Sequence, residues 1–356
     1  MNTLERIRLA SAFFSNERLG FRGESDLLTL LESELGSVDI LDRPVKGPQD
    51  VWMQAVAPSE IYHVCASNLD VSAEMSLMLG MILGSRLVFK LPSAGLPGFE
   101  NKARESGEAF GLSVECLHSH DPQRMREADA VVVFGSDETV QMIRLQTRPD
   151  RRFLAYGNKI SVGLVFPGTA GAELAEKAAW EVAAYEQLGC LSPQAYLCPD
   201  FHEAEIFAEQ LAAALEKREE EQPSPSRDFE QEALIFEARQ RALLRGNRLW
   251  GAREHRPWTV VLRQDGFLET GPGHRFIQVI PGSDWESILK PWKGKLSSIS
   301  LSDIYLGRRV LSAIGNLGFS RVCGVGELQE PRLCWRHDGR PRLADLVTWI
   351  TLENKQ

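Results

Sequence analysis

The amino-acid sequence predicts an α/β protein made of two domains. The chain has 356 residues, which is enough for two hydrophobic cores. Residues 60–165 alternate apolar strand-like runs with helical runs, a pattern typical of a parallel sheet that is covered on both faces. Two further apolar runs, at 257–262 and 275–281, indicate a second sheet.

The elements of the first domain follow one another along residues 1–156. Amphipathic patterns predict helices within residues 1–50, including SDLLTLLESEL with Ser25 as a candidate N-cap. The predicted strands are IYHVCAS (61–67), RLVFKL (86–91), SVECLH (113–118) and DAVVVFG (129–135). The predicted helices between them are SAEMSLMLGMILG (72–84), FENKARESGEAFG (99–111) and PQRMREA (122–128). Polar residues that directly follow these strands are candidates for a ligand site, because parallel sheets bind ligands at the carboxyl ends of their strands.

The second domain is predicted to span residues 157–317, followed by a C-terminal return segment at 318–356. KISVGLVF (159–166) predicts a strand, and the alanine-rich run 170–189 predicts a long helix that ends at a glycine. The highly charged residues 214–246 contain a proline-serine turn and predict a solvated helical hairpin.

Composition excludes several classes of function. The formal net charge of -9 and the pI of about 5.5 disfavour broad nucleic-acid binding, which needs a basic surface. The apolar run MSLMLGMILG (75–84) is too short to span a membrane, and charged residues interrupt the N-terminus where a signal peptide would be apolar. Six cysteines without a CxxC pair indicate reduced thiols and a cytoplasmic location, and their spacing predicts no metal site.

Three segments carry candidate ligand-binding residues at strand ends. Gly135 and Ser136 follow a predicted strand and begin a helix, where backbone N–H groups can bind a pyrophosphate. An ordinary helix cap explains the same pattern. The GxGxxG fingerprint of dinucleotide-binding proteins is absent from this stretch. Lys90 stands at the end of another predicted strand, and Ser93 lies shortly after it. Side chains at this position either contact a ligand or extend into solvent. Asn68 is a candidate oxyanion donor or a helix cap.

Cys190 is the candidate nucleophile. It follows Gly189 at the predicted end of a helix and precedes Pro193, which is predicted to begin a new one. A thiol ahead of a helix start would have its thiolate favoured by the helix dipole, whereas the alternative is a buried structural thiol. The other five cysteines are predicted to be packing residues: Cys65, Cys116, Cys198, Cys323 and Cys334.

The order of these residues, Asn68, Lys90 with its following serine, Gly135-Ser136 and then Cys190, resembles the aldehyde dehydrogenase superfamily. Three stretches resemble one branch of it, the acyl-CoA reductases of the bacterial bioluminescence type: AYGNKISVGLV (155–165), AAYEQLGCLSP (183–193) and HDGRPRLADLVTWI (337–350). The resemblance covers about 60–200 and 320–350. It implies a Rossmann-like cofactor domain followed by an α/β catalytic domain.

The resemblance also implies an activity and a set of roles. The activity is NADPH-dependent reduction of an acyl-CoA, with fatty acyl-CoA among the candidates, to an aldehyde through a thioester on Cys190. Asn68 and the Cys190 N–H would form the oxyanion hole. Lys90 and Ser93 would bind the adenosine side of NADPH, with NADH as the alternative, while Gly135 and Ser136 would meet the pyrophosphate. The implied partners are the acyl-CoA substrate, a protein that transfers acyl groups, and further copies of the chain in a homo-oligomer.

Two departures from the superfamily pattern keep alternatives open. AYGNKIS occupies the place of a segment that carries a glutamate base in the aldehyde-oxidising members, so hydrolysis of an acyl-enzyme should be slow. A glutamate for the nicotinamide ribose is not identifiable either. An acyl-phosphate reductase that uses the same thiol and a non-catalytic nucleotide-binding relative therefore remain alternatives. His337 and Asp338 suggest an acid–base pair, but Asp-Gly first of all predicts a turn.

Overall fold

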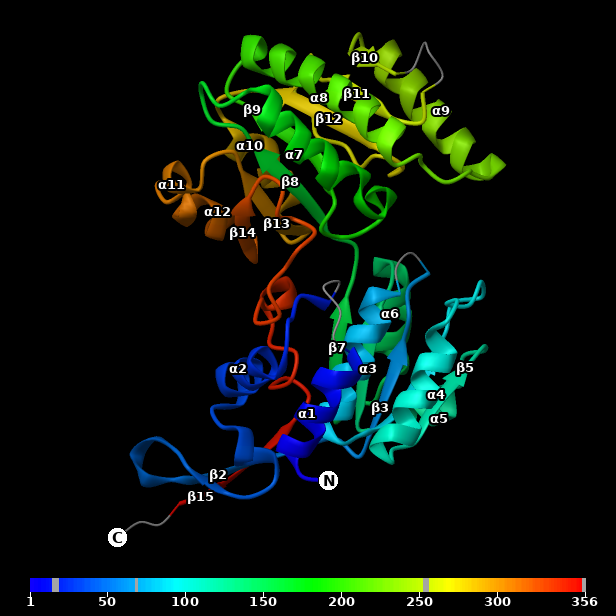
Figure 1. The fold of residues 1–356 in the computed structure, drawn as a ribbon, viewed down its shortest axis with the longest axis vertical. Helices are drawn as coiled ribbons and strands as arrows, with labels where there is room; N and C mark the ends of the chain where they lie inside the picture. Colours follow the sequence, from blue (N-terminus) through cyan, green and yellow to red (C-terminus); the bar gives the residue numbers. More distant parts are fainter. Residues whose placement is uncertain (15–18, 68–69, 252–255, 354–356) are drawn as a thin grey trace. The chain divides into compact units, whose positions relative to one another are not determined.

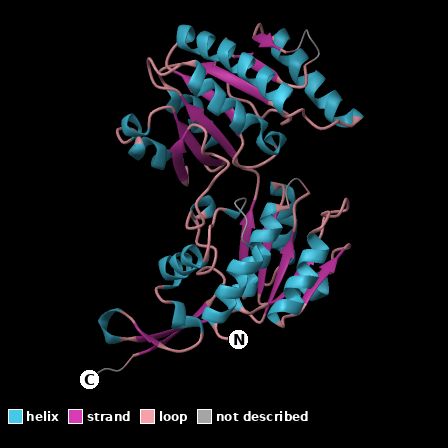
Figure 2. Ribbon diagram, in the orientation of Figure 1, coloured by secondary structure: helices cyan, strands magenta, loops and turns pink. Residues whose placement is uncertain are grey.

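The computed structural model describes residues 1–14, 19–67, 70–251 and 256–353. The chain divides into two compact units, each considered by itself below (Figures 1 and 2). Unit 1 comprises residues 1–158 and 332–356, and unit 2 comprises residues 159–331.

The described residues of unit 1 form two sheets, of three and five strands, together with several helices. Its helices are α1 (Thr3–Phe14), α2 (Glu24–Leu35), α3 (Val71–Leu83), α4 (Phe99–Phe110), α5 (Pro122–Glu127) and α6 (Asp137–Gln146), with short 3-10 turns η2 (Val38–Leu41), η3 (Pro48–Asp50) and η6 (His337–Gly339). Its strands are β1 (Val45–Lys46), β2 (Trp52–Val56), β3 (Glu60–Val64), β4 (Arg86–Lys90), β5 (Val114–Leu117), β6 (Ala130–Phe134), β7 (Arg152–Tyr156) and β15 (Thr348–Leu352).

The larger sheet of unit 1 is parallel, as the alternation of apolar and helical runs predicts. Within the described residues its strand order is β5-β4-β3-β6-β7, and every neighbouring pair is parallel. Helices α5 and α6 pack on one face and α3 and α4 on the other, where α1 packs against α3 and α4, and α2 against α1. Strands are added on both sides of β3, so the strand order reverses there, and parallel sheets bind ligands at the carboxyl edge of such a point.

The apolar run at 75–84 forms most of α3, which packs into the core of unit 1. None of the helices in the described part of the chain combines the length and the apolar composition that a membrane span requires.

The C-terminal segment returns to unit 1. Strand β15 pairs antiparallel with β2, so that Trp349 lies opposite Ala55, and Figure 1 shows the two strands side by side. The Glu34 carboxylate in α2 accepts hydrogen bonds from the backbone N–H groups of Arg342 and Leu343, at 3.0 and 2.6 Å. The segment is therefore joined to unit 1 by both a strand and a half-buried carboxylate.

Unit 2 contains one large sheet. Its strands are β8 (Ile160–Leu164), β9 (Pro193–Cys198), β10 (Arg248–Trp250), β11 (Thr259–Leu262), β12 (Phe276–Pro281), β13 (Leu296–Leu301) and β14 (Arg321–Gly324). Its helices are α7 (Ala172–Ala183), α8 (Phe201–Glu221), α9 (Phe229–Leu244), α10 (Trp285–Leu289), α11 (Ile304–Gly307) and α12 (Leu311–Leu317), with 3-10 segments η4 (Ala184–Gln187) and η5 (Lys290–Trp292).

This sheet has the order β10-β11-β12-β9-β8-β13-β14 in the described part of the chain, and only β10 there is antiparallel to its neighbour. Helices α7 and α8 pack on one face, and α10 and α12 pack on the other. Because β14 pairs with β13, the structure keeps residues up to 331 in unit 2, whereas the sequence expectation began the return segment at 318.

The charged segment 214–246 forms the expected pair of helices, joined by a loop, and residues 216–234 are exposed or half-buried, as expected for a solvated hairpin. Apolar side chains before and after this stretch anchor the pair on the sheet. Phe207, Leu211 and Leu215 of α8 are buried against the sheet. Ile235 of α9 is buried as well. The charges of these helices lie on the faces that remain exposed, and spacings of four residues place the apolar side chains on the other face.

Candidate functional site

Cys190 lies half-buried in the loop between η4 and β9 of unit 2. Both predictions for its flanks are wrong. Helix α7 ends at Ala183 rather than at Gly189, because residues 185–187 adopt left-handed backbone conformations. Pro193 begins a strand rather than a helix, because the residues from Pro193 onward pair with β8 and β12, and proline is accepted at the first position of a strand. No helix dipole therefore follows the thiol.

Hydrogen bonds hold the backbone at and after Cys190. The buried Ser161 hydroxyl in β8 donates to the Cys190 carbonyl at 2.8 Å and accepts from the Ser298 N–H at 3.3 Å. The Gln329 side chain donates to the Ser192 hydroxyl at 3.0 Å. The position of Cys190 is thus tied to two strands and to the segment that follows β14.

The segment before Cys190 has an unusual backbone. Tyr185, Glu186 and Gln187 have φ values of 53°, 52° and 58°, a region that residues with a Cβ seldom occupy. The buried Gln187 amide donates to the carbonyls of Pro193 at 2.7 Å and Phe276 at 2.9 Å. These bonds join the strained segment to the first residues of β9 and β12.

The other five cysteines differ from Cys190 in their surroundings. All six lie in the described residues, and none forms a disulfide. Burial raises the pKa of Cys65 and Cys323 to about 12 and that of Cys198 still further, and it raises the pKa of the half-buried Cys116 to about 11. High thiol pKa values disfavour the nucleophilic thiolate. Cys334 is exposed in a surface turn, so its prediction as a packing residue is wrong.

The candidate cofactor residues lie in unit 1 at the carboxyl edge of its parallel sheet. Lys90 ends β4, Gly135 and Ser136 follow β6, and β3 lies between these two strands. Two strand spacings separate Lys90 from Gly135, which is about 10 Å. Ser93 is exposed in the turn after β4. Asn68, the candidate oxyanion donor, lies outside the described residues.

The start of α6 is the candidate site for a pyrophosphate. The Ser136 hydroxyl caps the helix by accepting from the Thr139 N–H at 3.3 Å, which is the helix-cap alternative. It also bonds the Thr139 hydroxyl at 3.3 Å, where either oxygen can be the donor. A Cβ at Gly135 would lie 3.1 Å from Thr139 Cγ2, so this turn favours glycine. Asp137 and Glu138 oppose an anion here, but both are exposed and therefore screened by water. The N–H groups at this helix start fit a phosphate group.

The HDG stretch forms a turn, with Asp338 at a φ of 52°. The His337 ring stacks on the Tyr156 ring at 4.5 Å, and Tyr156 stacks on Phe134 at 4.7 Å. The Trp335 ring is tilted against the His337 ring, with 4.8 Å between the ring centroids. This row of aromatic rings places the turn against the carboxyl ends of β6 and β7, where it covers part of the sheet edge.

Sequence reasoning missed Ser161 and Gln187, two of the side chains that anchor the Cys190 loop. Ser161 is a polar residue inside an otherwise apolar strand, and this contrast could have indicated a hydrogen-bonding role. Gln187 lies three residues before Cys190, but its amide bonds to β12 could not be foreseen from local sequence. In the described residues, no cluster of three or more His, Cys, Asp or Glu side chains could hold a metal ion.

These two units together define an α/β protein with the aldehyde dehydrogenase fold. The aldehyde dehydrogenase KauB from Pseudomonas aeruginosa superposes with a TM-score of 0.72 at 13% identity, covering 99% of this chain and 84% of that one. An indole-3-acetaldehyde dehydrogenase in complex with NAD+ superposes with a TM-score of 0.70 at 15% identity, covering 99% and 85%.

The chain belongs to the acyl-CoA reductase (LuxC) family, whose model matches residues 10–349. A relative from Photobacterium leiognathi, long-chain acyl-protein thioester reductase 2, is 23% identical over 346 residues, which are 93% of this chain and 71% of the relative. A long-chain acyl-protein thioester reductase from Photorhabdus luminescens is 24% identical over 350 residues, 92% of this chain and 70% of the relative. The family and fold expected from the sequence are confirmed.

Proposed function

We propose that this protein reduces an acyl thioester to an aldehyde, with NADPH as reductant, through a thioester on Cys190. The observation that carries the proposal is a half-buried thiol in an anchored loop, in a chain of the LuxC family. Acyl-CoA is the proposed donor. The names of the relatives support a second donor, an acyl group carried by a partner protein.

The absence of disulfides among the six cysteines supports a cytoplasmic location.

The chain's own part in the reaction is acyl transfer. The Cys190 thiolate attacks the thioester carbonyl carbon, the bond from that carbon to the donor sulfur breaks, and the donor leaves as a thiol after taking up a proton. The Cys190 N–H, with Asn68 as the proposed second donor, stabilises the oxyanion between these events. When bound, NADPH would supply a hydride to the same carbon. The resulting thiohemiacetal breaks its carbon–sulfur bond, which releases the aldehyde and returns the Cys190 thiol.

Acyl transfer can be tested without the reductant. Intact-protein mass spectrometry after mixing with an acyl-CoA should show one acyl adduct, absent in Cys190→Ala and present in Cys334→Ala, the matched exposed thiol. An adduct that persists in Cys190→Ala would refute the proposed nucleophile. Parallel reactions with acyl-phosphate and with an acylated carrier protein identify the donor. A wild-type protein that takes no acyl group from any of them would favour a non-catalytic nucleotide-binding relative.

We also propose that copies of this chain associate through α9. Phe229, Phe236 and Leu243 are 89%, 64% and 47% exposed and recur every seven residues, so they lie along one face of the helix. An antiparallel pair of such helices would bury this face and bring acidic first halves against basic second halves. The exposed charges concerned are Glu230 and Glu232 in the first half, and Arg241 and Arg245 in and directly after the second half.

Oligomeric state provides the test of the α9 face. Phe236→Asp should shift the molar mass measured by light scattering toward that of the single chain, because the charge would be desolvated in the interface. Leu145→Asp is the matched control, since Leu145 is 81% exposed on α6. A mass that is the same in Phe236→Asp and in wild type would contradict association through α9.

A further inference from the structure

We propose that Arg275 is a positioning residue that holds the Cys190 loop in the geometry needed for acyl transfer, by means of its ion pair with Glu186. This inference rests on the proposed role of Cys190. Arg275 directly precedes β12, and Glu186 lies in η4, four residues before the thiol. The two residues are 89 positions apart in the sequence.

The Arg275 guanidinium is buried and donates hydrogen bonds to two carboxylates and one backbone carbonyl. Its side chain is only 1% exposed. Nη2 and Nε donate to Glu186 Oε1 at 2.6 and 3.1 Å. Nη1 donates to Glu219 Oε2 at 2.5 Å and to the Gln222 carbonyl at 3.2 Å, both at the end of α8. A buried cation is tolerated only with such pairing, and the pairing admits a single arrangement of the groups around it.

Arg275 also joins two segments of strained backbone. Among the described residues, seven non-glycine residues have positive φ, and five of them lie in 185–187 and 274–275. The His274 N–H donates to the Glu186 carbonyl at 2.7 Å, so the two segments are bonded through both backbone and side chains. Left-handed conformations persist at such residues only where surrounding contacts impose them, and they concentrate at functional sites. The ion pair is one of those contacts.

The Cys190 loop is therefore fixed from both directions. The Arg275 cluster holds the amino side at Glu186, and the Ser161 hydroxyl holds the Cys190 carbonyl itself. Without the guanidinium, the Glu186 carboxylate would lose its ion pair, whereas Glu219 would keep the hydrogen bonds that its Oε1 accepts from Ser224. Residues 185–187 would then relax toward ordinary conformations. The Cys190 Sγ and N–H would then move away from the positions that a carbonyl carbon and its oxyanion require.

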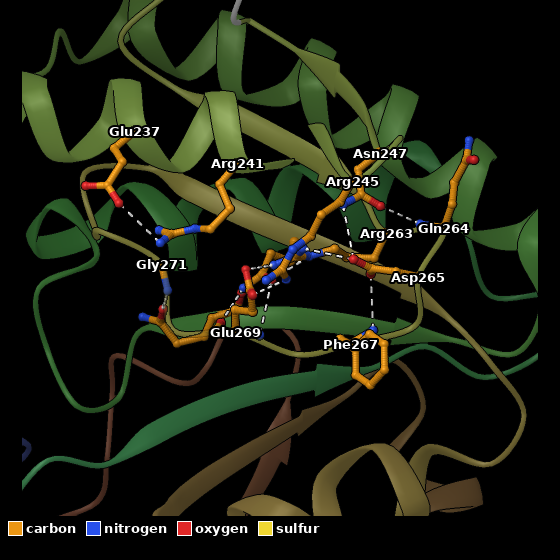
Figure 3. Close-up of polar contacts among 12 residues, drawn as sticks. Glu237, Arg241, Arg245, Asn247, Arg263, Gln264, Asp265, Phe267, Glu269 and Gly271 are labelled. Atoms are coloured by element: carbon orange, nitrogen blue, oxygen red, sulfur yellow. Dashed lines mark hydrogen bonds and ion pairs between the residues drawn. The ribbon is translucent and has the colours of Figure 1, made fainter. Parts of the chain in front are cut away.

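Arg263 offers a matched control. It is also a buried arginine next to a strand of unit 2, 2% exposed, and it directly follows β11. Its guanidinium donates to Gln278 Oε1 at 2.9 Å and to Glu269 Oε2 at 2.6 Å, and pairs with Asp265 at 3.4 Å (Figure 3). Arg263→Gln thus removes an equally buried charge whose partners are not those of Arg275.

Two rates at Cys190 test the proposal: acyl transfer from an acyl-CoA and alkylation by iodoacetamide, both followed by mass spectrometry. In Arg275→Gln and Glu186→Gln we expect the maximal acyl-transfer rate to fall about 100-fold at an unchanged half-saturating concentration, because positioning is lost while binding is kept. Alkylation should rise about threefold or more as the loop opens, since this small reagent needs only an accessible thiolate. Arg275→Lys should recover part of the acyl-transfer rate, and Arg263→Gln should change neither rate.

Acyl transfer within about threefold of wild type in both Arg275→Gln and Glu186→Gln would overturn the proposal, as would an equal loss in Arg263→Gln. Thermal unfolding is measured for each variant, and if Arg275→Gln does not fold, Glu186→Gln decides the question. If the wild-type protein takes no acyl group at all, the proposed function fails. The alkylation rates then decide the positioning role, which an unchanged rate in the folded variants would refute.

Discussion

Gly163 lies in the middle of β8, directly opposite Tyr196 of β9. A Cβ added at Gly163 would lie 2.1 Å from Cδ1 and 2.2 Å from Cε1 of the Tyr196 ring. The ring is fully buried, and its hydroxyl donates to Glu181 Oε2 at 2.6 Å. The Gly163→Ala substitution therefore forces the ring to move, and the ring cannot move without disturbing this hydrogen bond.

Two terms set the expected loss of stability in Gly163→Ala. Forcing an extra methyl group into a packed core typically costs about 1–3 kcal/mol. Displacing the Tyr196 hydroxyl from the buried Glu181 carboxylate adds about 1–3 kcal/mol. We therefore expect the free energy of unfolding to fall by about 4 kcal/mol. At Gly315 in α12, by contrast, no heavy atom of the described residues lies within 4 Å of an added Cβ, and Gly315→Ala should stabilise the helix by about 0.5–1 kcal/mol.

Urea denaturation followed by tryptophan fluorescence measures both variants. A loss below about 1 kcal/mol in Gly163→Ala, within the range of ordinary surface substitutions, would refute the predicted clash. A double-mutant cycle locates its origin: in a Tyr196→Ala background the ring is absent, so Gly163→Ala should cost little more. A full loss in that background would show that Tyr196 is not the obstacle.

Three further predictions concern the cofactor, the pH dependence and the acyl-enzyme. Lys90→Ala should weaken NADPH binding by about 1–3 kcal/mol more than NADH binding, as measured by fluorescence titration, because the ammonium would meet the 2′-phosphate; equal losses would remove that contact. Burial lowers the pKa of His63 from 6.5 to about 3, so the unfolded chain binds a proton that the folded chain rejects. Unfolding free energy should therefore fall by about 2 kcal/mol as the pH drops from about 6.5 to 5. His63→Phe should lose this slope, the exposed control His202→Phe should keep it, and identical slopes in all three would contradict the reasoning. The isolated acyl-Cys190 enzyme should persist in buffer and turn over when NADPH or coenzyme A is added; rapid decay to free acid in buffer alone would mean that another residue acts as a general base.

The structure also shows which residue of AYGNKIS can be replaced by glutamate to add a candidate base. A Cβ at Gly157 would lie 2.6 Å from the Asp137 carboxylate, so Gly157→Glu would combine a clash with charge repulsion. Asn158 is exposed, and only its backbone N–H donates to Asp137, at 3.0 Å. Asn158→Glu is therefore the better variant for testing whether an added carboxylate increases acid formation.

Local sequence was sufficient for four of the five strands that the structure describes in the parallel sheet of unit 1, but β7 was not predicted. Strands β3, β4 and β6 are short apolar runs between amphipathic helices, and burial on both faces of a sheet needs no more information than that pattern. The same reasoning placed Lys90, Gly135 and Ser136 at strand ends, because a residue that follows a strand in sequence also follows it in space. The position of Cys190 in a loop was equally local.

The conformation of the Cys190 loop was decided by contacts between residues far apart in the chain. Pro193 could begin a helix or a strand by its own preference, and pairing with β8 and β12 selected the strand. Residues 185–187 have no local signal for left-handed backbone, since no glycine is present there. Their strain is offset by Arg275 and by the Phe276 carbonyl, about 90 positions further along. Local preferences differ by about 1 kcal/mol per residue, whereas satisfying a buried charge or amide is worth more, so tertiary structure determined this part of the site.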